Sequence, residues 1–317
     1  MNSPAIHVVA GVLGDGQGRV LVAQRAAGKH LAGLWEFPGG KVDPGECALT
    51  ALRRELHEEL DVDIDVDSAT PLICVPWRYA DKAIVLDAYR VSAFTGVPAG
   101  REAQAIAWQR VEQLAKLDMP PPDRPIVSAL RLPSEYAITP EPGSGDAGFL
   151  RAVERAVTNG VRLLQLRAKS IDAARVHVLA RATREIAHAH GAWVLFNGDP
   201  DVADACGFDG LHLSSVRLMA MSRRPSADDR WLAASCHSEA EIDHANALGI
   251  DFGVLGPVMR TASHSDAAPL GWPRFAELAT RAAFPVFALG GLSADDTLVA
   301  RQHGAQGIAG ISAFFPS

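Results

Sequence analysis

"RRELHEEL", residues 53–60, has the composition of a helix, yet it places Glu55, Glu58 and Glu59 at positions i, i+3 and i+4. Carboxylates at this spacing share one face of a helix, and each like-charge pair destabilises it by about 0.2–0.5 kcal/mol. A solvated surface helix is the ordinary explanation of an acidic cluster. The alternative is a cation that lies between the carboxylates, and the sequence just upstream favours it.

The upstream segment "FPGGKVDPGE", residues 37–46, has the composition of a tight loop. Gly39, Gly40 and Gly45 permit turns and a close approach of the backbone to a ligand. The predicted helix that follows has a buried face of leucines at helical spacing, namely Leu49, Leu52, Leu56 and Leu60. A rigid loop followed by a helix that presents acidic side chains at one point suits hard divalent cations, which prefer oxygen ligands.

The fixed positions of this segment resemble the signature of the Nudix hydrolases, and they read Gly40, five residues, Glu46, seven residues, and then "RELHEELDV" at residues 54–62. Asp61 departs from the signature, because the family normally has a glycine that ends the helix at this position. Asp adopts unusual backbone conformations more readily than most residues do. We therefore expect a slightly strained helix end and intact chemistry.

The resemblance extends to the MutT-type 8-oxo-dGTP diphosphatases and covers residues 5–132. It rests further on "AQRAAGKHLAGLWEFPGGK", "REAQAIAW" and "PPPDRPIV". The fold that it implies is an α/β/α sandwich. The order of the predicted elements fits this fold, with strands at residues 6–13, 20–25, 72–79 and 83–94, the acidic helix, and a last helix after Val111.

Carried over residue by residue, the resemblance implies a site for Mg2+ or Mn2+ whose ligands are the Gly39 carbonyl, Glu55, Glu58, Glu59 and Glu102. Such cations neutralise phosphate oxygens and lower the pKa of an attacking water. The expected reaction is the attack of water on a nucleoside triphosphate, which yields the monophosphate and pyrophosphate. The four glutamates are also the candidate catalytic residues, and the sequence does not decide which of them is the general base.

The candidate substrate-binding residues are Arg25, Phe37, Lys41, Tyr79 and Asp123. Arg25 and Lys41 are candidates for the phosphate chain, and the alternative is that they are an exposed cation and a loop residue. The resemblance gives Arg54 a structural role, because in the family this arginine holds Glu46.

Asp123 stands where MutT-type enzymes have the asparagine that reads the purine. An amide can donate to O6 and accept from the N7 proton, which only the 8-oxo base has. An ionised carboxylate only accepts, so it repels O6 unless burial keeps it protonated. Alternatively, it accepts from the N1 and N2 protons of guanine, with Tyr79 as an aromatic contact. In either case we expect Asp123 to govern the discrimination between 8-oxo-dGTP and dGTP.

The pattern changes near "LRLPSEY", residues 130–136, which places the two domains at residues 1–132 and 133–317. Short apolar runs then alternate with amphipathic helices, and eight such runs indicate a parallel (β/α)8 barrel. The runs are "YAITP", "LLQLRA", "WVLFNG", "GLHLS", "WLAASCH", "FGVLGPV", "VFALGG" and "GIAGIS". Chemistry in this fold lies at the C-terminal ends of the strands. The residues expected at that mouth are Arg167, Lys169, Asn197, His212, His237, Gly291 and Ser312.

This half of the chain resembles thiamine-phosphate synthase and its relative TenI, the thiazole tautomerase, over residues 135–313. The likeness is carried by "VRLLQLRAKS", "FDGLHL", "ASCHSEAEI", "FGVLGPVMRT" and "VFALGGL". Gly290 and Gly291 imply a backbone site for one phosphate, and Arg167 with Lys169 provides the charge for a second. His237 matches the histidine that the tautomerase uses. A thiazole or pyrimidine phosphate is therefore the expected ligand.

Several departures argue against synthase activity. The two metal-binding aspartates of the synthase fall on Gly198 and Arg217, whose side chains cannot bind magnesium, and its pyrophosphate-contacting lysine falls on His264. The chain stops five residues after Ser312, so we expect the last barrel helix to be missing or reduced to a turn. A synthase needs its metal because charge develops on the departing pyrophosphate. We therefore expect the barrel not to act as a synthase.

Composition excludes several other classes of protein. The net charge is −7 and neither half has the basic excess of a protein that grips nucleic acid. The four cysteines form no CxxC pair, so neither a disulfide framework nor a zinc site is indicated. The start "MNSPAIHVVAGVL" lacks the basic region of a signal peptide. No apolar run approaches the roughly 18 residues that span a membrane, and we expect a cytoplasmic enzyme.

Three hypotheses follow from the sequence. The first is a MutT-type diphosphatase that sanitises oxidised nucleotides and is fused to a degenerate barrel. The second is a Nudix pyrophosphatase that acts on diphosphates of the thiamine pathway, for which the fusion itself is the motive. The third treats the barrel as a binding module that senses a thiazole or pyrimidine phosphate and regulates or recruits the first domain.

Overall fold

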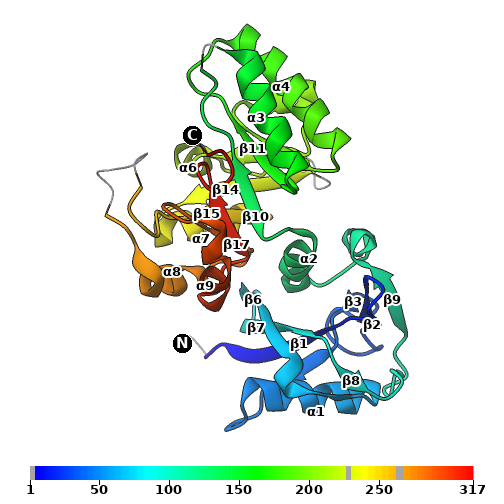
Figure 1. The fold of residues 1–317 in the computed structure, drawn as a ribbon. Helices are drawn as coiled ribbons and strands as arrows, with labels where there is room; N and C mark the ends of the chain where they lie inside the picture. Colours follow the sequence, from blue (N-terminus) through cyan, green and yellow to red (C-terminus); the bar gives the residue numbers. More distant parts are fainter. Residues whose placement is uncertain (1–3, 144, 226–229, 262–267, 317) are drawn as a thin grey trace. The chain divides into compact units, whose positions relative to one another are not determined.

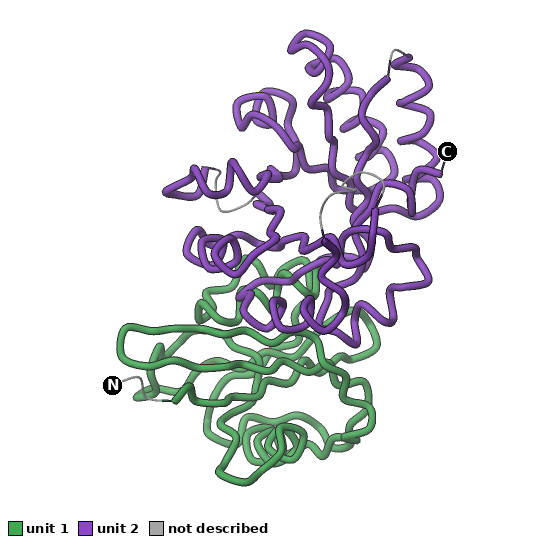
Figure 2. Tube along the Cα trace, turned by 90° about the vertical axis from the view of Figure 1, so that its left-hand side faces the viewer, with its two compact units in different colours: residues 1–131 green, residues 132–317 purple. Residues whose placement is uncertain are grey.

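The computed structural model describes residues 4–143, 145–225, 230–261 and 268–316. The chain divides into two compact units, residues 1–131 and residues 132–317 (Figure 2). None of the helices in the described ranges is both long and apolar enough to cross a bilayer.

Two sheets form most of unit 1 (Figure 1). The first has the strand order β4-β1-β7-β6, in which β1 is parallel to β7 and the other pairs are antiparallel, and its strands are β1 (Ile6–Leu13), β4 (Gly39–Lys41), β6 (Ala69–Arg78) and β7 (Ala83–Val91). The second sheet is antiparallel and consists of β2 (Arg19–Gln24), β3 (Trp35–Glu36) and β9 (Ile106–Arg110). A small pair is formed by β5 (Asp63–Ile64) and β8 (Phe94–Thr95).

The helix α1 (Ala48–Leu60) packs against β1 and β4. It buries Leu52, Leu56 and Leu60 completely, and these leucines share an apolar cluster with the core side of β1. Burial of a leucine side chain contributes about 1.5–3 kcal/mol, which outweighs the repulsion between the glutamates on the same helix. The leucine face thereby fixes the rotation of α1 and the direction in which its acidic side chains point.

The predicted last helix of unit 1 is interrupted. A 3₁₀ turn, η2 (Val111–Lys116), follows β9, a second short turn is η3 (Pro121–Asp123), and the α-helix α2 begins only at Arg124 and ends at Arg131. Residues 120–122 are all proline, and proline in a helix interior lacks the N–H that the helix needs. The predicted strand at residues 83–94 is likewise divided, because β7 ends at Val91 and Phe94 pairs separately in β8.

Unit 2 is a closed barrel of eight parallel strands, and each predicted apolar run overlaps one of them. The strands are β10 (Glu135–Ile138), β11 (Leu163–Arg167), β12 (Trp193–Asn197), β13 (Gly210–Leu213), β14 (Trp231–Cys236), β15 (Phe252–Leu255), β16 (Val286–Leu289) and β17 (Gly307–Gly310). The sheet closes where β17 pairs with β10.

Helices surround this barrel on the outside (Figure 1). They are α3 (Asp146–Thr158), α4 (Ala173–Ala189), α5 (Pro200–Cys206), α6 (Ser215–Ala220), α7 (Glu239–Leu248), α8 (Gly271–Ala279) and α9 (Thr297–Gln302), with the short turn η5 (Ala294–Asp296) before the last. After β17 the described residues 311–316 form turns and no helix, as the sequence predicts.

Aromatic side chains fill the inside of the barrel. Tyr136, Phe252 and Phe287 are fully buried, and the ring centroid of Tyr136 lies 5.3 Å from that of Phe252. The interior is therefore a packed core, and a ligand site belongs at the mouth.

The end of α1 has the strained geometry that the sequence predicts. Asp61 has φ 59° and ψ 34°, which is the left-handed region, and its N–H bonds to the His57 carbonyl. A residue other than glycine is disfavoured there.

We expect Asp61→Gly to stabilise the C-terminal turn of α1 by about 0.5–1 kcal/mol, because glycine adopts positive φ without steric cost. The measurement is native-state amide hydrogen exchange of peptides covering residues 48–61 in the full chain. Faster exchange in the variant would contradict the strain argument.

Candidate active site

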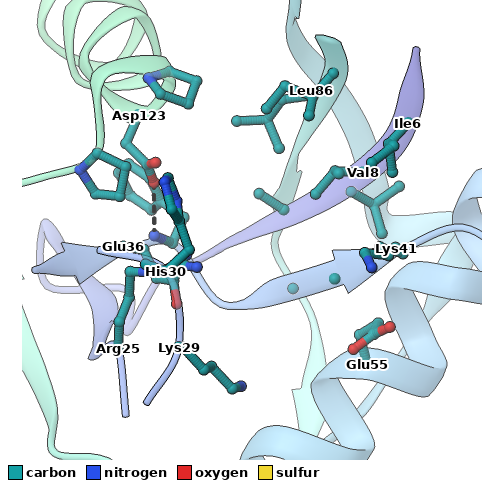
Figure 3. Close-up of a pocket in the computed structure, with 18 of the residues that line it drawn as sticks. Ile6, Val8, Arg25, Lys29, His30, Glu36, Lys41, Glu55, Leu86 and Asp123 are labelled. Carbon is teal, nitrogen blue, oxygen red and sulfur yellow. Dashed lines mark hydrogen bonds and ion pairs between the residues drawn. The ribbon is translucent and has the colours of Figure 1, made fainter. Parts of the chain in front are cut away.

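Unit 1 contains a pocket of about 480 Å³. Its walls come from β1, β7, the segments 25–31 and 36–43, α1, and the segments around residues 102 and 120–123. Figure 3 shows Asp123 and His30 toward one end and Lys41 and Glu55 toward the other. The lining thus combines a buried acidic end with a charged end beside α1.

The glycine loop runs too close to its neighbours for any side chain. Gly39 pairs with Ala10 of β1 and has φ 152°, and a Cβ atom there would overlap the Val9 carbonyl oxygen. A Cβ atom on Gly40 would overlap the Glu55 carboxylate. This close approach places backbone groups of the loop directly against the acidic side chains of α1.

Arg54 organises the outer side of the acidic helix. Its guanidinium lies 2.9 Å from Glu46 Oε2 and 2.8 Å from Glu55 Oε1, and it donates to the Lys41 carbonyl at 3.0 Å. The pairing of Arg54 with Glu46 that the resemblance implies is therefore present in the structure. Glu58 is more exposed, with 59% of its side chain accessible and its carboxylate 3.5 Å from Arg54, and it does not line the pocket.

Glu59 and Glu102 meet at the pocket through a lysine that the sequence analysis missed. Lys29 Nζ lies 2.5 Å from Glu102 Oε2 and 3.7 Å from Glu59 Oε1, and the hydrogen bond to Glu102 raises the pKa of the lysine. The Gly39 N–H donates to Glu59 Oε2 at 3.2 Å. Burial, together with the neighbouring carboxylates Glu36 and Glu102, raises the pKa of Glu59 to about 7.

The donors at this end suit a hard divalent cation. They are carboxylate oxygens of Glu55, Glu59 and Glu102 and the backbone of Gly39, all of which line the pocket, and Mg2+ prefers oxygen ligands. A positive charge already lies between two of them, because Lys29 bridges Glu59 and Glu102. Within the described ranges no three acidic, histidine or cysteine side chains converge on one point. A divalent cation fits the chemistry of these donors, two of which already contact the Lys29 ammonium.

Asp123 forms the other end of the pocket and is almost completely buried, with 5% of its surface accessible. Its Oδ1 accepts the Phe37 N–H at 3.0 Å (Figure 3). Burial, reinforced by the nearby Glu36 carboxylate, raises the pKa of Asp123 to about 7. This is the protonatable carboxyl that the sequence analysis leaves open.

Two other predicted substrate contacts also line the pocket. Arg25 forms an ion pair with Glu36 and donates to the His30 carbonyl at 2.7 Å, so its guanidinium lies beside the acidic end. The Tyr79 ring meets the His30 ring edge to face at 5.4 Å, and Lys82 Nζ lies 5.4 Å from the Tyr79 centroid. Aromatic and proline side chains at this end offer a surface for a flat ring.

In unit 2, Glu141, an acid that the sequence analysis missed, contacts the predicted cation Arg167 and the backbone beside the predicted Lys169. Arg167 pairs with Glu141 at 2.9 Å, and the backbone N–H groups of Lys169 and Ser170 donate to the same carboxylate at 2.9 and 3.1 Å. Asn197 Nδ2 donates to Gln165 Oε1 at 2.8 Å.

The two predicted histidines of the barrel differ in their environment. His212 has no exposed surface, lies 3.1 Å from the Tyr136 hydroxyl and 2.8 Å from Ser235 Oγ, and burial lowers its pKa to about 3, so it is neutral. His237 Nδ1 lies 2.6 Å from the Gly256 carbonyl. Because Nδ1 donates to that carbonyl, Nε2 is left to accept a proton.

The two positions at which the chain lacks the metal-binding aspartates of the synthase, Gly198 and Arg217, contact each other in the structure. Arg217 donates to the Gly198 carbonyl, so a cation stands where the resemblance places carboxylates. Gly290 and Gly291 follow β16 with φ 103° and 69°, and Ser312 follows β17 in a turn. His264 lies outside the described residues.

Comparison with known proteins finds two families along the chain. Residues 135–314 match the family described as thiamine monophosphate synthase, and residues 5–130 match the NUDIX domain. A protein of Aquifex aeolicus, provisionally named thiamine-phosphate synthase 2, is 34% identical over 185 residues, which is 58% of this chain and 99% of that one. The thiamine-phosphate synthase of Chromobacterium violaceum is 36% identical over 189 residues, 58% of this chain and 89% of that one.

One similar solved structure comes from a study of MutT from Aliivibrio salmonicida and Vibrio cholerae. It is 32% identical, covers 40% of this chain and 97% of that one, and has a TM-score of 0.35.

Proposed function

We propose, for a chain that belongs to the thiamine monophosphate synthase family and carries a NUDIX hydrolase domain at its N-terminus, that the pocket of unit 1 hydrolyses 8-oxo-dGTP or related oxidised nucleotides to the monophosphate and pyrophosphate. The observation that carries the proposal is one pocket with carboxylates of α1 at one end and the buried Asp123 at the other. The role that follows is the sanitation of the nucleotide pool, which supports DNA replication and repair.

The charged end supports phosphoryl chemistry. A bound Mg2+ or Mn2+ would supply neutralisation of the phosphate oxygens and a lowered pKa of the attacking water. Gly39, Glu55 and Glu59 would hold it, with Glu58 and Glu102 as the further ligands that the resemblance implies. Lys41 lines the same end and would bind the phosphate chain. Glu59 Oε1 is free of the Gly39 N–H and would either accept the water proton or ligate the cation.

We expect Glu59→Gln to lower kcat by about 100-fold or more in saturating Mg2+ or Mn2+, because both roles need a carboxylate. Glu58→Gln should have a smaller effect, because its carboxylate is exposed outside the pocket. Steady-state kinetics on 8-oxo-dGTP are the measurement, and Glu112→Gln, an exposed acid outside the pocket, is the control. Near-wild-type turnover of Glu59→Gln would refute the metal-site proposal.

The buried end supports recognition of the base. With a pKa of about 7, Asp123 is protonated and can donate to O6 at low pH, whereas above pH 7 it only accepts. One lone pair of Oδ1 is already used by the Phe37 N–H, so a protonated Oδ2 would donate to O6 and the second lone pair of Oδ1 would accept the N7 proton of the 8-oxo base.

We expect the kcat/KM ratio of 8-oxo-dGTP over dGTP to fall as pH rises from about 6 to about 9, by roughly tenfold. Ionised Asp123 repels O6, and the carboxylate then loses the bond to the N7 proton, which only the 8-oxo base has. Asp123→Asn keeps an amide donor at every pH and should make the ratio independent of pH. If the substitution leaves the ratio unchanged at every pH, Asp123 does not read the base.

A second candidate function is favoured by the fusion itself. A NUDIX domain joined to a member of the thiamine monophosphate synthase family could act on diphosphates of the thiamine pathway. Turnover of 8-oxo-dGTP, dGTP, oxidised pyrimidine triphosphates and thiamine diphosphate under the same conditions separates the two candidates. The first predicts the highest kcat/KM for an oxidised triphosphate, and the second predicts it for thiamine diphosphate.

For the barrel we propose phosphate-ester binding through Gly291, Ser312 and Lys169 without synthase chemistry. The absence of synthase chemistry is supported by Arg217 and Gly198, which stand where the resemblance places carboxylates. Arg217 donates a hydrogen bond to the Gly198 carbonyl. His237 Nε2 is the proton acceptor that a tautomerase step would use.

We expect the full chain to form no detectable thiamine phosphate from the pyrimidine diphosphate and the thiazole phosphate, because the barrel mouth has no carboxylate at these two positions to hold a cation. The thiazole phosphate alone should raise its thermal unfolding temperature, which would also support a sensing role. Robust synthase turnover in a coupled assay would overturn this expectation.

A further inference from the structure

Lys29 occupies an unusual position for a loop lysine. Its ammonium lies between Glu102, at 2.5 Å, and Glu59, at 3.7 Å, at the charged end of the pocket. The two carboxylates come from segments that are 43 positions apart in the sequence, and each is a candidate ligand of a divalent cation. The lysine therefore supplies positive charge where the proposed function needs a metal ion.

The loop that carries Lys29 is held by backbone bonds. The Arg25 N–H donates to the Leu34 carbonyl and the Gly33 N–H donates back to the Arg25 carbonyl, both at 2.9 Å. Arg25 Nε donates to the His30 carbonyl at 2.7 Å. Rotation of the Lys29 side chain therefore moves the ammonium without breaking any of these bonds.

The Lys29 side chain has room for such a rotation. It is 43% exposed and its partner Glu102 is 46% exposed, whereas Glu59 is only 13% exposed. An ammonium and a divalent cation repel each other strongly at the distance of a shared carboxylate pair. Simultaneous binding of both cations to Glu59 is therefore unfavourable, and the lysine, with 43% of its side chain exposed, is the cation that can turn away.

We infer that Lys29 is the internal cation of the metal-free site: it neutralises Glu59 and Glu102, a divalent cation displaces its ammonium, and the released ammonium binds an oxygen of the phosphate chain. This inference rests on the proposed function, because it requires the cation site of that function. An ordinary surface ion pair would differ from it, because removing the lysine would then leave the affinity for a divalent cation unchanged.

The test is a titration of the full chain with Mn2+ alone. Binding is measured by calorimetry or by electron paramagnetic resonance of the free Mn2+. Lys29→Met removes the competing ammonium and should bind Mn2+ about tenfold more tightly than the wild type. Lys82→Met is the matched control, because Lys82 lines the same pocket but lies over the Tyr79 ring at the other end. It should change the affinity by less than about twofold.

A second readout concerns the released ammonium. At saturating Mn2+, Lys29→Met should raise the KM for the nucleotide, and Lys29→Arg should restore it in part because the charge is retained. Equal Mn2+ affinity of Lys29→Met and Lys82→Met, or weaker binding by Lys29→Met, overturns the inference. Glu59→Gln reports separately on the proposed function: it should lose Mn2+ binding, and if it binds as the wild type does, the cation site itself is wrong and the inference falls with it.

Discussion

The packing of α1 against β1 and the glycine loop is the constraint on which the site depends. Leu52 and Leu56 are buried against the core, and this fixes the direction of Glu55 and Glu59, which lie beside the leucine face and line the pocket. The loop then approaches so closely that Gly40 has no room for a Cβ atom beside the Glu55 carboxylate. Apolar burial of several leucines outweighs the repulsion of the acids, so the helix can hold charges together that would otherwise separate.

Charge balance within the pocket follows from this forced proximity. Arg54 binds Glu55 on the outer side and Lys29 binds Glu59 on the inner side, so the clustered acids are compensated without a metal ion. The barrel mouth likewise contains an internal ion pair, because Glu141 binds Arg167. In both units a charged side chain that we expect to bind a ligand is paired with another side chain of the same unit: Glu59 with Lys29 in unit 1, and Arg167 with Glu141 in unit 2.

Much of this arrangement could be predicted from the sequence, because it rests on local pattern. The strand at residues 6–13 and all eight barrel strands follow from runs of apolar residues. The strained end of α1 follows from Asp61, which stands where the resemblance has a glycine. The contacts of Lys29 with Glu102 could not be predicted, because they join residues 73 positions apart in loops without periodicity. The interruption of the last helix before α2 was also not predicted, although three consecutive prolines at residues 120–122 indicate it.

The central claim is that the acidic face of α1 binds a divalent cation against the glycine loop. Anomalous diffraction from crystals of the full chain soaked in Mn2+ tests it most directly. We predict a peak within coordination distance of a Glu59 carboxylate oxygen and the Gly39 backbone, with Lys29 Nζ displaced from Glu59. A map without a peak in this pocket, with Lys29 still bridging Glu59 and Glu102, would contradict the claim.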